Sequence, residues 1–128
     1  MGEKELNSPS RKSHNEYIFD NGKFLGNFEG LYRDFKDPWG QTEVFESHDT
    51  RRFLALNYCN RSKFKDRSKV RVLEIGCGFG HMTDALRLDG FSSVGVDVSA
   101  EAIKQARFRH PDSVFFSDRY LKPICLTN

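Results

Sequence analysis

The chain has 128 residues, which is the length of one domain, and its hydrophobic fraction of 38% is enough to bury a core. Its 20 basic and 18 acidic residues give a net charge of +2, so the overall charge provides no drive toward nucleic acid or a membrane surface. The three cysteines lack metal-ligand spacing, and no apolar run reaches the ~18 residues of a membrane span, so we expect a cytoplasmic protein with neither a metal site nor a membrane anchor.

The first half of the chain is predicted to be irregular and then partly helical. Residues 1–15 are polar and charged, so we expect a disordered leader there. Residues 16–69 follow as a helical and loop segment. Within it, glycines interrupt the aromatic residues of 17–39, which predicts short turns and one helical turn at 28–35. The apolar spacing of residues 41–60 predicts a helix.

From residue 70 onward the pattern alternates between strand and helix. The expected strands lie at 70–75, 91–97 and 113–117, and the expected helices at 79–88 and 101–109, with Ser99 as the N-cap of the second. In a strand–helix–strand connection of this length the two strands are usually parallel and the helix forms a right-handed crossover between them. The predicted fold class is therefore α/β, a parallel sheet of three strands with two crossover helices, preceded by an aromatic-rich N-terminal helical segment.

A glycine-rich turn follows the first expected strand. The candidate ligand-binding residues of this turn are Glu74, Gly76, Cys77, Gly78 and Gly80. Glycines let the main chain turn tightly and approach a ligand, and the following helix directs its first N–H groups to the same place. His81 stands where a dinucleotide fingerprint needs its third glycine, and no Gly-Lys-Ser/Thr follows, so both the dinucleotide site and the P-loop are excluded.

Carboxylates follow the other two expected strands. Asp97 ends the second strand, where an ionised carboxylate can accept hydrogen bonds from both hydroxyls of a ribose. Asp118 follows the third strand and can accept a hydrogen bond from an exocyclic amine. A ligand that has no pyrophosphate but has a cationic amino-acid end suits the acid in the turn. These residues therefore indicate S-adenosylmethionine.

Three segments resemble motifs of the class I S-adenosylmethionine-dependent methyltransferases. Residues 72–83 (VLEIGCGFGHMT) resemble the first motif, residues 94–106 the second and residues 114–118 the third, in the family's order. The resemblance implies that residues 70–128 form part of a Rossmann-like domain. It also implies that Glu74 and the turn bind the methionine portion, Asp97 the ribose, and Val98 and Asp118 the adenine.

A shorter likeness bears on the methyl acceptor. Residues 37–40 (DPWG), with Phe45-Glu46 and Arg51-Arg52, resemble the lead-in of nodulation-type N-methyltransferases and related enzymes of sugar or polysaccharide biosynthesis. This resemblance implies an acceptor that is a small molecule, a sugar or a polysaccharide. No residue is assigned as catalytic.

Members of the family continue past the third strand, and this affects what the chain is expected to do. In the family's strand order, 3-2-1-4-5-7-6, residues 70–75 would form an exposed edge here. We therefore expect a truncated chain that pairs with a second copy or with another chain, and its activity by itself stays open. Two other functions also stay open: an RNA methyltransferase that uses the basic residues of 61–71, and a non-catalytic module that binds the cofactor or docks on a partner.

Overall fold

The computed structural model describes residues 12–42, 57–58 and 64–117. Its first helix, α1 (His14–Ile18), begins inside the range expected to be a leader. Ser13 and Glu16 explain this start, because the Glu16 carboxylate accepts a hydrogen bond from the Ser13 N–H, as in a capping box. The rest of the expected leader, residues 1–11, lies outside the described part of the chain.

A short hairpin follows α1 and was not anticipated from the sequence. Its strands, β1 (Phe19–Asp20) and β2 (Lys23–Phe24), pair antiparallel, and the rings of Phe19 and Phe24 meet edge to face with their centroids 5.9 Å apart. The two turn residues, Asn21 and Gly22, both have positive φ, 47° and 78°. Asn-Gly is a strong hairpin signal because such turns match the twist of the strands.

Helix α2 (Phe28–Asp34) confirms the helical turn predicted for this region. Asn27 is its N-cap and accepts a hydrogen bond from the Gly30 N–H at 3.0 Å. The Tyr17 hydroxyl donates to Asp34 Oδ2 and so connects α1 to α2. Of the helix expected at 41–60, the structure describes two helical pairs of residues, 41–42 and 57–58, and the remainder lies outside the described ranges.

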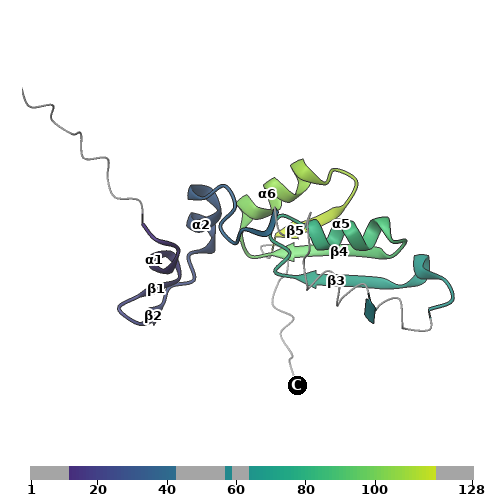
Figure 1. The fold of residues 1–128 in the computed structure, drawn as a ribbon, viewed down its shortest axis with the longest axis horizontal. Coiled ribbons are helices and arrows are strands. Elements are labelled where there is room, and N and C mark those ends of the chain that lie inside the picture. Colours follow the sequence, from purple (N-terminus) through teal and green to yellow (C-terminus); the bar gives the residue numbers. More distant parts are fainter. Residues whose placement is uncertain (1–11, 43–56, 59–63, 118–128) are drawn as a thin grey trace, which may run out of the picture.

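The second half of the described chain is the predicted α/β unit, shown in Figure 1. A 3₁₀ turn, η1, leads into the first strand of a three-stranded parallel sheet with the order β3-β4-β5. The elements are η1 (Arg67–Lys69), β3 (Arg71–Ile75), α5 (His81–Leu88), β4 (Ser92–Asp97), α6 (Ala100–Arg109) and β5 (Val114–Ser117). This arrangement confirms the fold class, with two helices connecting three parallel strands.

The ends of the two helices depend on single residues. Helix α5 begins at His81, two positions later than expected, because Gly80 adopts a left-handed conformation (φ 79°) just before it. Ser99 caps α6 as predicted, and its hydroxyl accepts a hydrogen bond from the Ala102 N–H at 3.0 Å.

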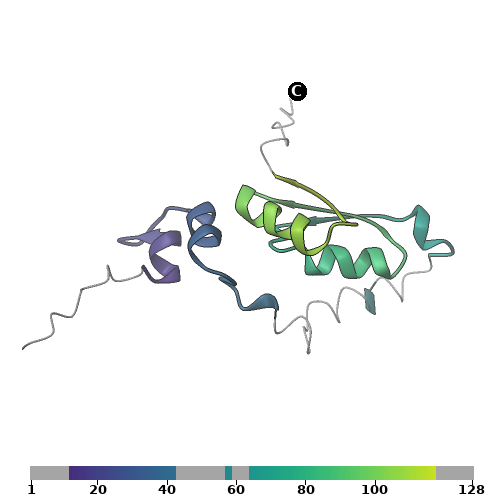
Figure 2. The same ribbon diagram turned by 90° about the horizontal axis from the view of Figure 1, so that it is seen from above.

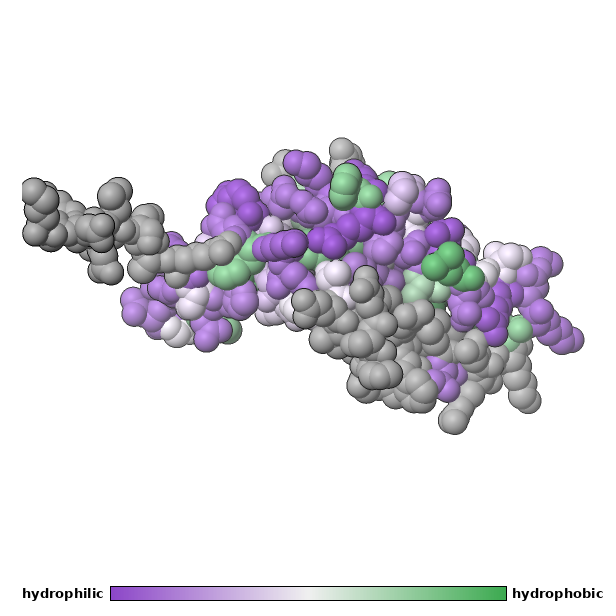
Figure 3. All heavy atoms as spheres, turned by 45° about the horizontal axis from the view of Figure 1, so that its top comes forward, coloured by the Kyte–Doolittle hydropathy of each residue, from purple (hydrophilic) through white to green (hydrophobic). Residues whose placement is uncertain are grey.

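Both helices cover the same face of the sheet, as Figures 1 and 2 show. This follows from the topology, because two right-handed crossovers that advance in one direction put their helices on one side. In Figure 3, which turns the helix side forward, the visible described surface is mostly hydrophilic. The core beneath the helices includes one cluster of buried residues: Cys77, Ile103, Ala106 and Phe115.

The sheet has an exposed edge and an apolar face in the described part of the chain. Strand β3 pairs there with β4 alone, as expected for residues 70–75. Leu73 and Ile75 on this strand are 58% and 81% exposed, and Val114 and Phe116 on β5 are exposed as well. The alternation of side chains along a strand places these residues on the face opposite the buried Phe115.

Candidate functional site

The glycine turn and Asp97 form one hydrogen-bonded unit at the carboxyl ends of β3 and β4. The Gly78 N–H donates to Asp97 Oδ2 at 2.8 Å, and the Ser99 N–H donates to Asp97 Oδ1 at 2.9 Å. Asp97 is 7% exposed, so these bonds satisfy a buried charge. A carboxylate has roughly four acceptor positions, and the two bonds leave capacity for further donors.

The first and last glycines of the turn have different roles. Gly76 has a φ of 73°, and a Cβ added there would meet no heavy atom within 4 Å, so its main chain is open to a ligand. Gly80 has a φ of 79°, and a Cβ added there would lie 2.3 Å from the Phe115 ring. Gly76 therefore leaves space in front of the turn, whereas Gly80 allows the turn to pack against β5.

The remaining predicted site residues lie in unlike surroundings. Glu74 Oε2 accepts a hydrogen bond from the Thr83 hydroxyl, which orients the carboxylate from α5. The Cys77 side chain is buried in the core, and burial, with the charges of Asp97 and Glu74, raises the pKa of its thiol. Val98 is 55% exposed just after β4. Asp118 lies outside the described residues.

Tyr32 of the N-terminal segment lies against the turn, and Trp39 contacts Tyr32. The Tyr32 hydroxyl lies 2.9 Å from the position that a Cβ on Gly78 would take, and it accepts a hydrogen bond from Trp39 Nε1 at 3.0 Å. The Tyr32 ring is also 5.5 Å from the Phe79 ring. Burial, followed by the charge of Asp97, raises the pKa of Tyr32, so its hydroxyl stays protonated.

Helix α2 is attached to the beginning of α6. Glu29 Oε2 accepts a hydrogen bond from the Ser99 hydroxyl at 2.9 Å, and Glu29 Oε1 accepts one from the Glu101 N–H at 3.1 Å. A negative charge at this position also interacts favourably with the N-terminal end of the helix dipole. The N-terminal segment is thereby held beside the carboxyl ends of the strands.

Two histidines connect the start of α5 to the end of α6. His81 Nδ1 lies 2.9 Å from His110 Nε2, and His110 Nδ1 lies 3.2 Å from Asp84 Oδ2. His81 Nε2 is also 3.2 Å from the Thr42 hydroxyl. Burial lowers the pKa of His110 despite the neighbouring carboxylate. Burial alone would raise the pKa of Asp84, but hydrogen bonds from Ser113 and Arg87 hold it below its ordinary value.

The described part of the basic stretch has a structural partner. Arg67 donates to the Asp89 carbonyl at 3.1 Å and pairs with Asp89 Oδ2 at 3.3 Å, and its guanidinium lies over the Phe91 ring. These contacts attach η1 to the turn after α5.

In the described ranges, no helix is both long and apolar enough to cross a bilayer.

Comparison with known proteins identifies similar chains. The family described as a methyltransferase domain matches residues 45–123. The mitochondrial ubiquinone biosynthesis O-methyltransferase of Mus musculus is 30% identical over 105 residues, which cover 77% of this chain and 28% of that protein. The chain thus spans less than a third of the length of this relative.

Two solved structures are also similar. The PH0226 protein of Pyrococcus horikoshii OT3 aligns with a TM-score of 0.47 and 28% identity, over 70% of this chain and 42% of that one. A TehB-like SAM-dependent methyltransferase of Corynebacterium glutamicum aligns with a TM-score of 0.48 and 17% identity, over 69% of this chain and 45% of that one.

Proposed function

The chain belongs to the methyltransferase-domain family, and from this premise we propose that it binds S-adenosylmethionine at the glycine turn and presents the methyl group to an acceptor. This membership confirms the family expected from the motifs at 72–83, 94–106 and 114–118. The observation that carries the proposal is the hydrogen bond between the Gly78 N–H and Asp97. It brings a turn open to a ligand and a carboxylate suited to ribose to the same place.

Each described residue of the site has a distinct part in holding the donor. The open main chain at Gly76 would accept the methionine portion, and Glu74, oriented by Thr83, would attract its ammonium group. The free acceptor capacity of Asp97 suits the ribose hydroxyls, and the exposed Val98 suits one face of adenine. Cys77 would contribute its main chain, because its side chain points into the core. The role of Asp118 at the adenine amino group remains a prediction.

Methyl transfer depends more on the alignment of the acceptor with the methyl group than on a reactive side chain. When bound, S-adenosylmethionine supplies a methyl group already activated by its sulfonium. The task left to the protein is to hold the acceptor in line and to exclude water. Tyr32, which lies against the turn, and Trp39, which donates a hydrogen bond to the Tyr32 hydroxyl, are suited to excluding water. Cys77 is not a candidate nucleophile because its buried thiol is held protonated.

The acceptor is proposed to be a small molecule, a sugar or a polysaccharide. The likeness of residues 37–52 to the lead-in of sugar-modifying N-methyltransferases supports this class. The mouse relative is named for O-methylation in ubiquinone biosynthesis, which also involves a small molecule. A cytoplasmic location is part of the same proposal. A partner-docking module is a second candidate, and the exposed edge of β3 supports it.

Calorimetry with S-adenosylmethionine and S-adenosylhomocysteine tests the proposal. We expect the wild-type chain to bind both and Asp97→Ala to bind each at least about tenfold more weakly, because hydrogen bonds to a charged group contribute ~1.5–3 kcal/mol. Asp112→Ala removes an exposed carboxylate next to β5 and is the matched control. Equal affinity of Asp97→Ala and wild type, with both folded by circular dichroism, would contradict the assignment.

A further inference from the structure

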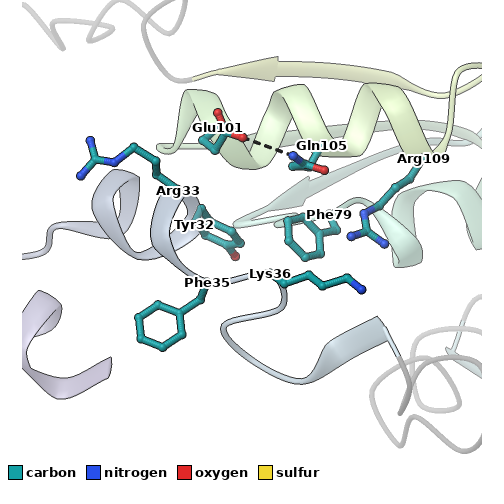
Figure 4. A pocket seen from close by; sticks show the side chains of 8 residues that line it. All are labelled: Tyr32, Arg33, Phe35, Lys36, Phe79, Glu101, Gln105 and Arg109. Atoms are coloured by element: carbon teal, nitrogen blue, oxygen red, sulfur yellow. Dashed lines mark hydrogen bonds between the residues drawn. The ribbon is translucent and has the colours of Figure 1, made fainter. Parts of the chain in front are cut away.

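A cavity of about 360 Å³ lies between α2 and α6, next to the glycine turn, and it has no role in the proposed donor site. Figure 4 shows the side chains that line it. Its aromatic lining comes from Tyr32, Phe35 and Phe79. Pockets for small ligands in proteins span roughly 300–1,000 Å³ and combine apolar walls with a few polar groups. The cavity is therefore large enough for a small ring-bearing molecule.

Arg109 supplies the polar group of this cavity. Its guanidinium lies over the Phe79 ring, 4.4 Å from the ring centroid. The Arg109 Nε is buried, and it has no hydrogen-bond partner among the described residues. A buried donor without an acceptor costs free energy, and such groups in native structures commonly have a function.

The charges around the cavity favour an anion. Lys36 and Arg109 line it, and Glu101 is the acid among its lining residues. Arg33 also lines it, but its guanidinium pairs with Asp34 at 3.2 Å and extends away from the cavity in Figure 4. In Figure 4 the Lys36 and Arg109 side chains extend to the end of the cavity at Phe79, and Glu101 lies toward the opposite end. Glu101 Oε1 accepts a hydrogen bond from Gln105 Nε2 at 3.2 Å, which leaves its negative charge in place, so the preference for an anion belongs to the end of the cavity at Lys36 and Arg109.

We propose that this cavity binds a small ligand that carries an oxyanion, a carboxylate or a phosphate, on a flat apolar body. The oxyanion pairs with Arg109, whose planar guanidinium matches two oxygens at once, and with the Lys36 ammonium. The flat body lies along the aromatic lining, where Phe35 is partly exposed and the rings of Tyr32 and Phe79 are largely buried behind it. Phe79 belongs to the glycine turn and Tyr32 contacts it, so this ligand would lie next to the donor site but outside it.

The test uses phenylacetate and phenyl phosphate as probes, titrated into the 128-residue chain and followed by NMR. The two arms distinguish a carboxylate from a phosphate. We expect at least one probe to bind, and benzyl alcohol, which has the ring without the charge, to bind at least tenfold more weakly. Arg109→Gln and Lys36→Gln should each weaken probe binding at least threefold. Lys104→Gln, an exposed cation on α6, is the control and should leave binding unchanged.

The outcomes separate this proposal from the donor site. Arg109→Gln should bind S-adenosylmethionine as the wild type does, and the probe and S-adenosylmethionine should bind together. Competition between them would overturn the proposal, because the cavity would then belong to the donor site. Failure of both probes to bind, or equal binding of benzyl alcohol, would overturn it as well. Lys36→Gln keeps the test informative if Arg109→Gln does not fold, because Lys36 is an exposed side chain.

Discussion

The Glu29 carboxylate accepts a hydrogen bond from the Ser99 hydroxyl at 2.9 Å and so links two residues that are 70 positions apart in the chain. The Ser99 oxygen accepts a hydrogen bond from the Ala102 N–H, so the Ser99 hydroxyl caps α6 and also donates a hydrogen bond to Glu29 on α2. The N-terminal segment therefore docks on the α/β unit through the same residue that starts α6. This contact also fixes one wall of the cavity at Arg109.

Glu29→Ala should loosen α2. Loss of the bonds to Ser99 and the Glu101 N–H should lower the free energy of unfolding by about 1 kcal/mol, since Glu29 is exposed and its hydrogen bonds compete with water. Urea unfolding measures this change, and hydrogen exchange of the α2 amides should speed up. Glu29→Gln keeps one acceptor oxygen, so its free energy of unfolding should lie between those of the wild type and Glu29→Ala. Unchanged exchange in α2 of Glu29→Ala would contradict the docking role.

The two outer glycines of the turn should respond differently to alanine. Gly80→Ala should destabilise the fold by about 2–4 kcal/mol for two reasons. The new Cβ would overlap the Phe115 ring, and the alanine would have to adopt a left-handed backbone conformation. Gly76→Ala should cost about 1–2 kcal/mol, the conformational part alone. Gly22→Ala has a similar φ in open space away from the site and is the matched control. Thermal melts compare the three.

Donor binding then distinguishes Gly76 from its control. Gly76→Ala should weaken S-adenosylmethionine binding, because its methyl group would occupy the open space in front of the turn, and Gly22→Ala should not. If both variants bind equally well, Gly76 does not face the ligand.

Stability should fall as the pH drops through the titration range of His110. Burial lowers the pKa of His110 in the folded chain, so the unfolded chain binds the proton first, from about pH 6.5 downward. Unfolding free energy should therefore decrease below about pH 6.5 and level off below the folded pKa. His81, Asp84, Arg87 and Arg109 are the titratable and charged groups around this ring.

Urea unfolding between pH 8 and pH 5 checks this dependence. His110→Gln should flatten the decrease, whereas His14→Gln, at an exposed position on α1, should preserve it. A profile of His110→Gln parallel to that of the wild type would assign the decrease to another group. The loss of stability from protonating Asp84 lies at lower pH, because the pKa of that carboxyl is lowered.

The exposed edge and face of the sheet should drive association of the 128-residue polypeptide. Ile75, which is 81% exposed on β3, should contribute most, and Ile75→Lys should shift the polypeptide toward the monomer in light scattering. Phe108→Lys removes an apolar residue that is 84% exposed on α6, away from the sheet, and should have a smaller effect. A monodisperse monomer of the wild-type polypeptide would contradict the expectation.

The parts of the fold that depend on residues close together in the sequence were predictable from it. The strands, the cap at Ser99 and the meeting of the turn with Asp97 follow from local pattern and from the rule that parallel strands end at one edge. The hairpin at Asn21-Gly22 was missed although its turn signal is local, because its strands of two residues are too short to show alternation.

Contacts between elements that are far apart in the sequence could not be predicted from local sequence pattern. The stacking of Arg109 on Phe79 and the pairing of Glu29 with Ser99 depend on how α2 packs, and periodicity within α2 does not encode its partner. Tyr32 likewise reaches the turn through tertiary packing. The sequence therefore led to a prediction of the donor side of the site, and it did not locate the cavity next to it.

The contact between Gly80 and Phe115 couples the composition of the turn to that of the third strand. Because the ring fills the space where a Cβ at position 80 would lie, the cost of a larger residue at position 80 depends on the size of the residue at position 115. We expect relatives with alanine or serine at position 80 to carry a smaller residue at position 115. The double variant Gly80→Ala/Phe115→Leu should likewise recover part of the stability that Gly80→Ala loses, so these two positions would covary across the family.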